Sequence, residues 1–250
     1  MNVAPIFILA SERSGTNLLR RRVSESQGYV FGPSPLHFLK HLYYAEPYYG
    51  ALSQRDTLLR FVKDALGLAY HHFSPWDMTI EPGEVVKRYS EFLPGSPCAV
   101  GVMHVIYTIY AQSKGYQTYL CKDNHLFDFV EPIRAALPDA RFIYLYRDPR
   151  DVVASQLKRP GQIRSVSYLS GLWRDEQIRC IRHVKELESE GKLRRVSYEA
   201  LVTDENAVIE EIISAFDLRG LRGRPEVFDR EQTLIHEWSN LGAPTIRDNI

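Results

Sequence analysis

Pro5-Ile-Phe-Ile-Leu-Ala-Ser-Glu-Arg-Ser-Gly-Thr-Asn-Leu-Leu-Arg20 decides the fold of this chain. Its apolar run, residues 6–10, has the length and composition of a buried parallel strand. A polar turn with one glycine, Gly15, follows, and the amphipathic residues after the turn predict a helix. In this order of elements, the free N–H groups at the helix start point above the end of the strand, where they favour an anion such as a phosphate.

This turn differs from the P-loop of nucleoside-triphosphate hydrolases, G-x-x-x-x-G-K-[ST], at two positions. Ala10 stands in place of the first glycine, and Gly15 is followed by Thr16 instead of lysine. That lysine contacts the β- and γ-phosphates, so its absence argues against ATP hydrolysis. The turn therefore predicts a phosphate carried by a different donor. An ordinary βα turn without a ligand is the alternative.

The composition is that of an ordinary globular chain. Its 250 residues, 44% of them hydrophobic and 25% charged, predict one domain over 1–250. The formal net charge of +0 gives no indication of nucleic acid or of an anionic membrane as a partner. The odd number of widely spaced cysteines (Cys98, Cys121 and Cys180) indicates a reducing compartment rather than a disulfide framework.

Targeting signals are not evident in the sequence. No apolar run reaches the roughly 18 residues of a membrane-spanning helix. The first expected strand begins almost at the N-terminus, which leaves no room for a signal peptide. We therefore expect a cytoplasmic protein without a membrane span, and homodimer formation stays open.

Further apolar runs predict a sheet whose strands alternate with helices. The expected strands are 6–10, 28–32, 117–121, 141–146 and 193–198. This alternation favours a three-layer α/β/α fold with a central, roughly five-stranded parallel sheet. A long helical block of about residues 35–115, rich in aromatic residues at 38–49, lies between the second and third strands. Such a block is where an α/β enzyme recognises its variable substrate.

A second polar turn follows the strand expected at 141–146. It places Arg147 at the end of the strand, Asp148 as the N-cap of a helix, and Ser155 about two turns along that helix. The ligand crevice of an open parallel sheet lies at the carboxyl ends of its strands. This turn and the turn at 11–17 are therefore predicted to face the same ligand.

Taken together, the two turns resemble those of the sulfotransferases that use 3′-phosphoadenosine-5′-phosphosulfate (PAPS). Arg13-Ser-Gly-Thr-Asn-Leu-Leu19 is similar to that family's 5′-phosphosulfate loop in its arginine-bearing form. Residues 138–155 are similar to its 3′-phosphate motif, and Val196-Ser-Tyr-Glu-Ala-Leu201 is similar to the stretch that follows in the same family. The resemblance extends from residue 5 to about 218, except for 40–115, and it implies a fold like that of the P-loop NTPases.

The resemblance implies a role for each matched residue. The residues that would hold the 5′-phosphosulfate are Arg13, Ser14, Gly15, Thr16 and Asn17. Arg147 and Ser155 would bind the 3′-phosphate, which distinguishes PAPS from ATP and AMP, and the fork of an arginine pairs with two phosphate oxygens at once. Tyr198 would lie near the adenine. PAPS is then the donor co-substrate and adenosine 3′,5′-bisphosphate (PAP) the product, and no metal is implied.

Two histidines compete for the role of the base that removes the proton of the acceptor hydroxyl. Lys122 and His125 resemble the family's K-x-H pair beside the acceptor, although the spacing here is one residue longer. His37 is the rival, because its segment resembles an acceptor-side segment of some bacterial members. An imidazole that titrates near neutrality suits the task at either position. We favour His125, with a purely structural histidine as the alternative at each position. The leaving phosphate needs a cation, for which Arg13 and Lys122 are the candidates.

The sequence thus predicts a sulfotransferase that moves the sulfuryl group of PAPS to a hydroxyl of a small, partly apolar acceptor by in-line displacement. One alternative is a nucleotide-dependent kinase or other phosphotransferase on the same fold. The other is a protein that binds a nucleotide without catalysis. The basic–glycine segment near the C-terminus of some members has no clean match here, although Arg219, Arg222 and Arg224 are available.

Overall fold

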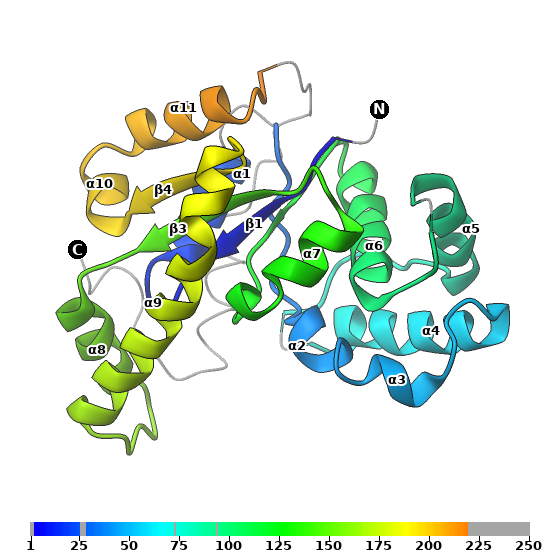
Figure 1. The fold of residues 1–250 in the computed structure, drawn as a ribbon, viewed down its shortest axis with the longest axis horizontal. Helices are drawn as coiled ribbons and strands as arrows, with labels where there is room; N and C mark the ends of the chain where they lie inside the picture. Colours follow the sequence, from blue (N-terminus) through cyan, green and yellow to red (C-terminus); the bar gives the residue numbers. More distant parts are fainter. Residues whose placement is uncertain (1–2, 26–28, 73, 94, 220–250) are drawn as a thin grey trace.

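The computed structural model describes residues 3–25, 29–72, 74–93 and 95–219. Within these residues, four parallel strands form one sheet in the order β2-β1-β3-β4 (Figure 1). They are β1 (Ile6–Leu9), β2 (Leu120–Cys121), β3 (Arg141–Tyr146) and β4 (Leu193–Ser197). The chain passes from β1 to β2 on one side and returns to β3 on the other. The turns after β1 and β3 therefore flank the point where the strand order reverses, which is the usual ligand crevice of such a sheet.

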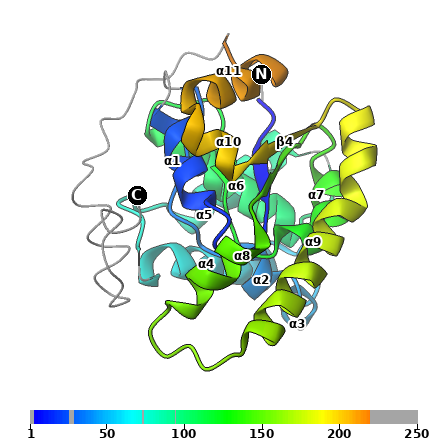
Figure 2. The same ribbon diagram turned by 90° about the vertical axis from the view of Figure 1, so that its left-hand side faces the viewer.

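Alternate residues of the strands enter two separate cores, because successive side chains of a strand point to opposite faces of the sheet. Ile6 and Ile8 enter one core, and Phe7 and Leu9 enter the other. Helices that contribute to the first core are α1 (Thr16–Glu25), α10 (Tyr198–Thr203) and α11 (Glu205–Ala215). Helices that contribute to the second are α2 (Phe38–Leu42), α4 (Arg55–His71), α5 (Pro82–Phe92), α6 (Ala99–Ser113), α7 (Val130–Ala136) and α9 (Val166–Ser189). Figure 2 shows α1 and α9 on opposite sides of the strands, which confirms the expected three-layer α/β/α fold.

The sheet has one strand fewer than expected within the described residues. The run predicted as a strand at 28–32 contributes only a single parallel bridge, between Phe31 and Tyr119. The backbone of Gly32 is occupied instead by side chains of α1: its N–H donates to Ser24 Oγ at 2.7 Å, and its carbonyl accepts from Arg20 at 2.6 Å. A residue whose N–H and C=O are both taken in this way cannot continue a ladder of strand hydrogen bonds.

The helical block between α1 and β2 contains α2, α3 (Glu46–Tyr49), α4, α5 and α6, and Figure 1 shows it on the β1 side of the sheet, away from β4. Every residue of α6 from Ala99 to Ala111 is buried, so this helix is the centre of the block. Within the block, α4 ends at His71 and α5 begins at Pro82, and both lie in the stretch predicted to be helical.

After β2 the chain forms a short 3₁₀ turn, η1 (Leu126–Asp128), and then α7. Helix α8 (Pro149–Leu157) follows β3 as predicted. None of the helices in the described part of the chain is long and apolar enough to cross a bilayer.

Candidate functional site

The turn between β1 and α1 has an unusual backbone. Arg13 and Gly15 both lie in the left-handed region, with φ of 70° and 92°. This conformation is free of cost for glycine but strained for arginine. A Cβ on Gly15 would lie 2.3 Å from Cδ2 of Tyr198, so this position needs glycine for space as well as for conformation. Helix α1 begins at Thr16, directly after the turn.

Two neighbouring residues of α9 hold this turn in place. Gln177 donates from Nε2 to Ser11 Oγ at 3.0 Å, and Ser11 Oγ lies 2.9 Å from Ser14 Oγ. Glu176 accepts the backbone N–H of Glu12 with its carboxyl group. The hydroxyl of Ser14 is therefore engaged within the turn, and α9 holds the turn at two adjacent residues, at the side chain of Ser11 and at the backbone N–H of Glu12.

The turn after β3 meets the turn after β1, as predicted. Arg13 donates from Nε to Ser155 Oγ at 3.0 Å, and Arg147 donates from Nη1 to the carbonyl of Arg13 at 3.3 Å. The guanidinium of Arg147 lies over the ring of Tyr198, 4.0 Å from its centroid. These contacts form one cluster of residues from three separate parts of the sequence: Arg13, Gly15, Arg147, Ser155 and Tyr198.

This cluster contains a buried polar atom without a partner among the described residues, the Nε of Arg147. The nearest carboxylate, Asp151, is 3.8 Å from Nη2 of the same guanidinium. Buried donors are nearly always hydrogen-bonded in proteins, so this N–H needs an acceptor from a water or a ligand. A guanidinium N–H needs an acceptor, and an anionic group fits best. Asn17 lies in the first turn of α1, where its Oδ1 is buried and likewise unpaired.

Asp148 fixes the start of α8 beside Arg147. Its side chain caps the helix by accepting from the N–H of Arg150 at 2.8 Å, which confirms the predicted N-cap. Hydrogen bonds from Arg150 lower the pKa of Asp148 to about 2. The N–H of Asp148 donates to Glu199 Oε1 at 3.0 Å, and this bond joins the starts of α8 and α10.

A buried carboxylate connects the end of β2 to the start of α2. Asp123 is 5% exposed, and it accepts the N–H of Leu36 at 3.1 Å and the N–H of Phe38 at 2.7 Å. Burial raises the pKa of Asp123, and the backbone N–H groups oppose this shift. The two hydrogen bonds hold His37, which lies between the two donors, at the exit of β2.

Asn124 then ties this region to the turn after β1. Its backbone N–H donates to Nδ1 of His37 at 3.1 Å, and its Oδ1 accepts from Nζ of Lys122 at 3.2 Å. Its Nδ2 donates to Glu12 Oε1 at 2.8 Å, and the other oxygen of Glu12 accepts from Arg159 at 2.7 Å. The structure therefore brings the predicted residues His37 and Lys122 together with Glu12, the neighbour of Arg13.

The hydrogen bond to Nδ1 determines which form of His37 is present. A ring nitrogen that accepts an N–H carries no proton, so neutral His37 carries its proton on Nε2 and presents a donor there. Burial, with a further contribution from the positive charge of Lys122, lowers the pKa of His37 to about 3. His37 is therefore a neutral hydrogen-bond donor at physiological pH.

His125 is in a different position. Its ring makes no hydrogen bond within the described residues and lies 5.5 Å from the ring of Phe127, centroid to centroid. Burial, and then the charge of Lys40, lower the pKa of His125. The ring is thus unprotonated near neutral pH, and its nitrogens are available to a ligand.

Backbone strain is concentrated at these residues. Among the described residues other than glycine, four have positive φ, and three of them are Arg13, His37 and His125. Such conformations cost of order 1–3 kcal/mol each and tend to cluster at functional sites. Three of the residues that the sequence motifs indicate thus have a strained backbone.

Sequence reasoning missed several residues that hold the site together: Glu12, Asp123, Asn124, Glu176 and Gln177. A signal was present for two of them, because Asp123 and Asn124 are the residues that lengthen the expected K-x-H spacing. Glu176 and Gln177 carry no local signal, since they lie in the middle of a long amphipathic helix.

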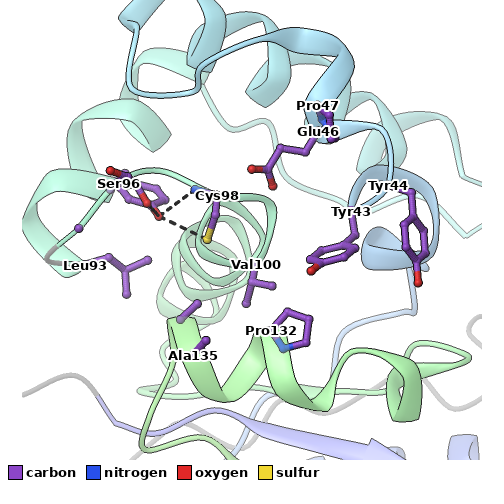
Figure 3. A pocket seen from close by; sticks show the side chains of 13 residues that line it. Tyr43, Tyr44, Glu46, Pro47, Leu93, Ser96, Cys98, Val100, Pro132 and Ala135 are labelled. Carbon is purple, nitrogen blue, oxygen red and sulfur yellow. Dashed lines mark hydrogen bonds between the residues drawn. The ribbon is translucent and has the colours of Figure 1, made fainter.

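A cavity of about 640 Å³ lies between α3, α6 and α7 (Figure 3). Tyr43 and Tyr44 line it from the predicted aromatic segment, and Val100 and apolar residues of α7 also line it. None of its lining residues belongs to either turn or to the segment 122–125. The rings of Tyr43 and Tyr44 pack against Phe129, at 5.3 and 5.8 Å, so the cavity lies next to the segment that follows His125.

Two polar groups in this cavity have structural partners. Glu46 accepts the N–H of Ala99 at the start of α6 at 2.7 Å, and the hydroxyl of Tyr89 accepts the N–H of Cys98 at 3.2 Å.

In the described residues, no group of three or more histidine, cysteine, aspartate or glutamate side chains could hold a metal ion. Arg219 pairs with Glu210 at 2.9 Å. The other two arginines considered near the C-terminus, 222 and 224, lie outside the described residues.

The similarity of this chain to known proteins includes all residues of the site. The sequence model of the "Sulfotransferase family" matches residues 5–221. The solved structure of a sulfotransferase domain from the curacin biosynthetic pathway is similar, with a TM-score of 0.56 and 18% identity, over 86% of this chain and 74% of that chain. The sulfotransferase domain of the Synechococcus PCC 7002 olefin synthase is also similar, with a TM-score of 0.57 and 19% identity, over 98% of this chain and 85% of that chain. No curated protein sequence matches this chain. At these identities the two structures support the fold alone.

Proposed function

The chain belongs to the sulfotransferase family, and we propose that it transfers the sulfuryl group of PAPS to a hydroxyl of a small, partly apolar acceptor. The observation that carries this proposal is the contact between the two turns, in which Arg13 bonds to Ser155 and the guanidinium of Arg147 keeps a buried, unpaired N–H. Two cations and a hydroxyl at the carboxyl ends of β1 and β3 suit a ligand with phosphate at both ends of a nucleoside.

The 3′-phosphate would be held at Arg147 and Ser155. The unpaired Nε of Arg147 needs an acceptor, and the planar guanidinium fits two phosphate oxygens. The ring of Tyr198, which already stacks on this guanidinium, offers an aromatic surface for the adenine. This half of the site would distinguish PAPS from ATP, which has no 3′-phosphate.

The 5′-phosphosulfate would be held in the turn after β1. Arg13 supplies a guanidinium, and the start of α1 supplies the N–H groups of Gly15, Thr16 and Asn17. Ser14 would contribute through its backbone N–H, since its hydroxyl is bonded to Ser11.

When bound, PAPS would supply the sulfuryl group, and PAP would leave with the electrons of the broken S–O bond. His125 would take the proton of the acceptor hydroxyl, because its ring is unprotonated and has free nitrogens. His37 presents an N–H on Nε2 and would orient the acceptor or a sulfuryl oxygen rather than act as a base. Lys122 and Arg13 would stabilise the negative charge that develops on the leaving phosphate.

The acceptor would be recognised by the helical block of about residues 35–115. The aromatic pair Tyr43 and Tyr44 and the cavity beside them support an acceptor with an apolar part. The family match spans both turns and this block, which supports a single sulfotransferase domain with the block as its acceptor side.

PAPS turnover by histidine variants tests the assignment of the base. The purified protein is incubated with PAPS and a panel of small phenols and aliphatic alcohols, and PAP is quantified by chromatography. Replacing His125 by alanine should lower turnover by about 10²–10⁴-fold, whereas PAP binding should persist. His41→Ala is the matched control, since His41 is an exposed residue of α2. Wild-type turnover in the His125→Ala protein, with a large loss in His37→Ala, would contradict the assignment.

A further inference from the structure

The donor turn, residues 11–17, rests on a buried acid. Glu176 lies in the middle of α9 and is only 2% exposed, and its carboxyl group accepts the backbone N–H of Glu12. Its second oxygen, Oε2, is buried and has no hydrogen-bond partner among the described residues. An ionised carboxylate in such a place would be a charge removed from water with one oxygen unsatisfied, which is far more costly than a neutral carboxylic acid.

The charged groups around Glu176 do not compensate a negative charge there. Two acids face it, Glu12 from the donor turn and Asp128 from η1, and both oppose ionisation. Arg179, on α9, is a nearby cation that favours ionisation, but it is bonded to both oxygens of Asp128 at 3.0 Å. Cys180, the next neighbour on α9, is a buried thiol whose pKa is raised, so it stays neutral.

We propose that Glu176 is a positioning residue of the donor turn and that it acts in its uncharged, protonated form, so that loss of its proton weakens binding of the anionic donor. This inference rests on the proposed PAPS site. A protonated Glu176 still accepts the N–H of Glu12 and keeps the turn in shape. A deprotonated Glu176 adds a second negative charge next to Glu12, beside the turn that must receive the phosphosulfate.

The pH range follows from the same surroundings. Burial, and then the charge of Glu12, raise the pKa of Glu176 to about 7 from its ordinary 4.5. A bound anion would raise this pKa further. If the increase is about one unit, the affinity for the donor falls about tenfold as the pH rises through neutrality and both forms become deprotonated.

Stability without any ligand should change in the same direction. Below pH 4.5 the side chain is protonated in both the folded and the unfolded chain. Between this value and about 7 only the unfolded chain releases the proton, so the free energy of unfolding falls as the pH rises. Glu176→Gln resembles the protonated acid and lacks this loss. Its melting temperature should match that of the wild-type protein at pH 4.5 and exceed it at pH 8.

The decisive experiment is calorimetric titration of PAP into the wild-type protein and Glu176→Gln at pH 6 and pH 8.5. The wild-type dissociation constant should rise about tenfold more between the two pH values than that of the variant. Titration of PAP itself is common to both proteins and cancels in the ratio. Asp175→Asn is the matched control, because it removes a charge from the adjacent residue of α9, whose side chain is 57% exposed. It should behave as the wild-type protein does.

Each outcome separates this inference from the proposed function. Equal pH dependence in the wild-type protein and Glu176→Gln, with PAP bound by both, would overturn the inference alone. No PAP binding at either pH by the wild-type protein would overturn the donor site itself. If the variant does not fold, proton uptake by the wild-type protein on PAP binding at pH 8, measured in buffers of different ionisation enthalpy, gives the answer. We expect about 0.4 proton per PAP, and no uptake would contradict the inference.

Discussion

The two sides of the candidate site are built in different ways. On the donor side (Arg13, Arg147, Ser155 and Tyr198), the two arginines stand in turns that directly follow β1 and β3. On the histidine side (His37, Lys122, Asn124 and His125), the position of His37 depends on hydrogen bonds that span 85 and 87 positions of the sequence. The order of strands thus places the donor side, whereas one buried aspartate and one asparagine place the histidine side.

This difference explains why the donor side can be predicted from the sequence, whereas the position of His37 can change with the variable block. A strand, turn and helix determine the position of an arginine locally, and parallel neighbours then bring two such turns together. Asp123 and Asn124 instead connect the sheet to the first helix of the variable block. A change in that block can therefore move His37 relative to the sheet without any change in Arg13 or Arg147.

The largest effect is expected from removing the anchor of the histidine side. Asp123→Ala leaves the buried N–H groups of Leu36 and Phe38 without acceptors, so the free energy of unfolding should fall by about 4 kcal/mol. Denaturant titration measures this loss. Asp139→Ala, at an exposed residue before β3, should change stability by no more than about 0.5 kcal/mol. A similar small loss for Asp123→Ala would break the comparison, because the histidine side would then have another anchor.

The next effect concerns the donor side. Arg147→Ala should weaken PAP binding by roughly 3 kcal/mol, more than a hundredfold, because charge-assisted hydrogen bonds to the 3′-phosphate are lost. Adenosine 5′-monophosphate, which lacks that phosphate, should bind the variant and the wild-type protein alike. Arg150→Ala is the control, since the side chain of Arg150 is 88% exposed. Equal losses for both nucleotides would show that Arg147 does not recognise the 3′-phosphate.

The smallest effect is expected at the link between the two sides. Glu12 bonds to Asn124 and forms an ion pair with Arg159, whose side chain is 45% exposed. A double-mutant cycle of Glu12→Gln and Arg159→Gln should give a coupling of at most about 1 kcal/mol, and high salt should reduce it. A coupling well above about 2 kcal/mol would mean that the ion pair with Arg159 fixes Glu12 where it meets Asn124, so that the link between the two sides is rigid.

Much of the fold was predictable because its signals are local. The apolar runs of β1 and β3, the N-cap at Asp148 and the helical periodicity of α9 all follow from residues next to one another in the sequence. The prediction of a strand at 28–32 was wrong because the backbone N–H and carbonyl of Gly32 are hydrogen-bonded to the side chains of Ser24 and Arg20. These tertiary hydrogen bonds leave no signal in the local sequence.

The candidate site was predictable to the same extent and for the same reason. The motifs indicate the cluster of Arg13, Arg147 and Ser155, but not Glu176, whose contact with the donor turn depends on how α9 crosses the sheet. Two separate resemblances, one at 122–125 and one around His37, indicate His125 and His37 as rivals. Only the hydrogen bond from Asn124 to Nδ1 shows that His37 presents a donor, which leaves His125 as the proposed base.

The central claim, that the two turns form one PAPS site, is tested most directly by thermal unfolding with PAP, ADP or ATP at equal concentration. PAP at about 100 times its dissociation constant should stabilise the protein by roughly 2.7 kcal/mol, which raises the melting temperature of a chain of this size by several degrees. This shift is expected with PAP, and little or none is expected with ADP and ATP. A shift with ATP as large as that with PAP would contradict the claim and return the site to phosphoryl transfer.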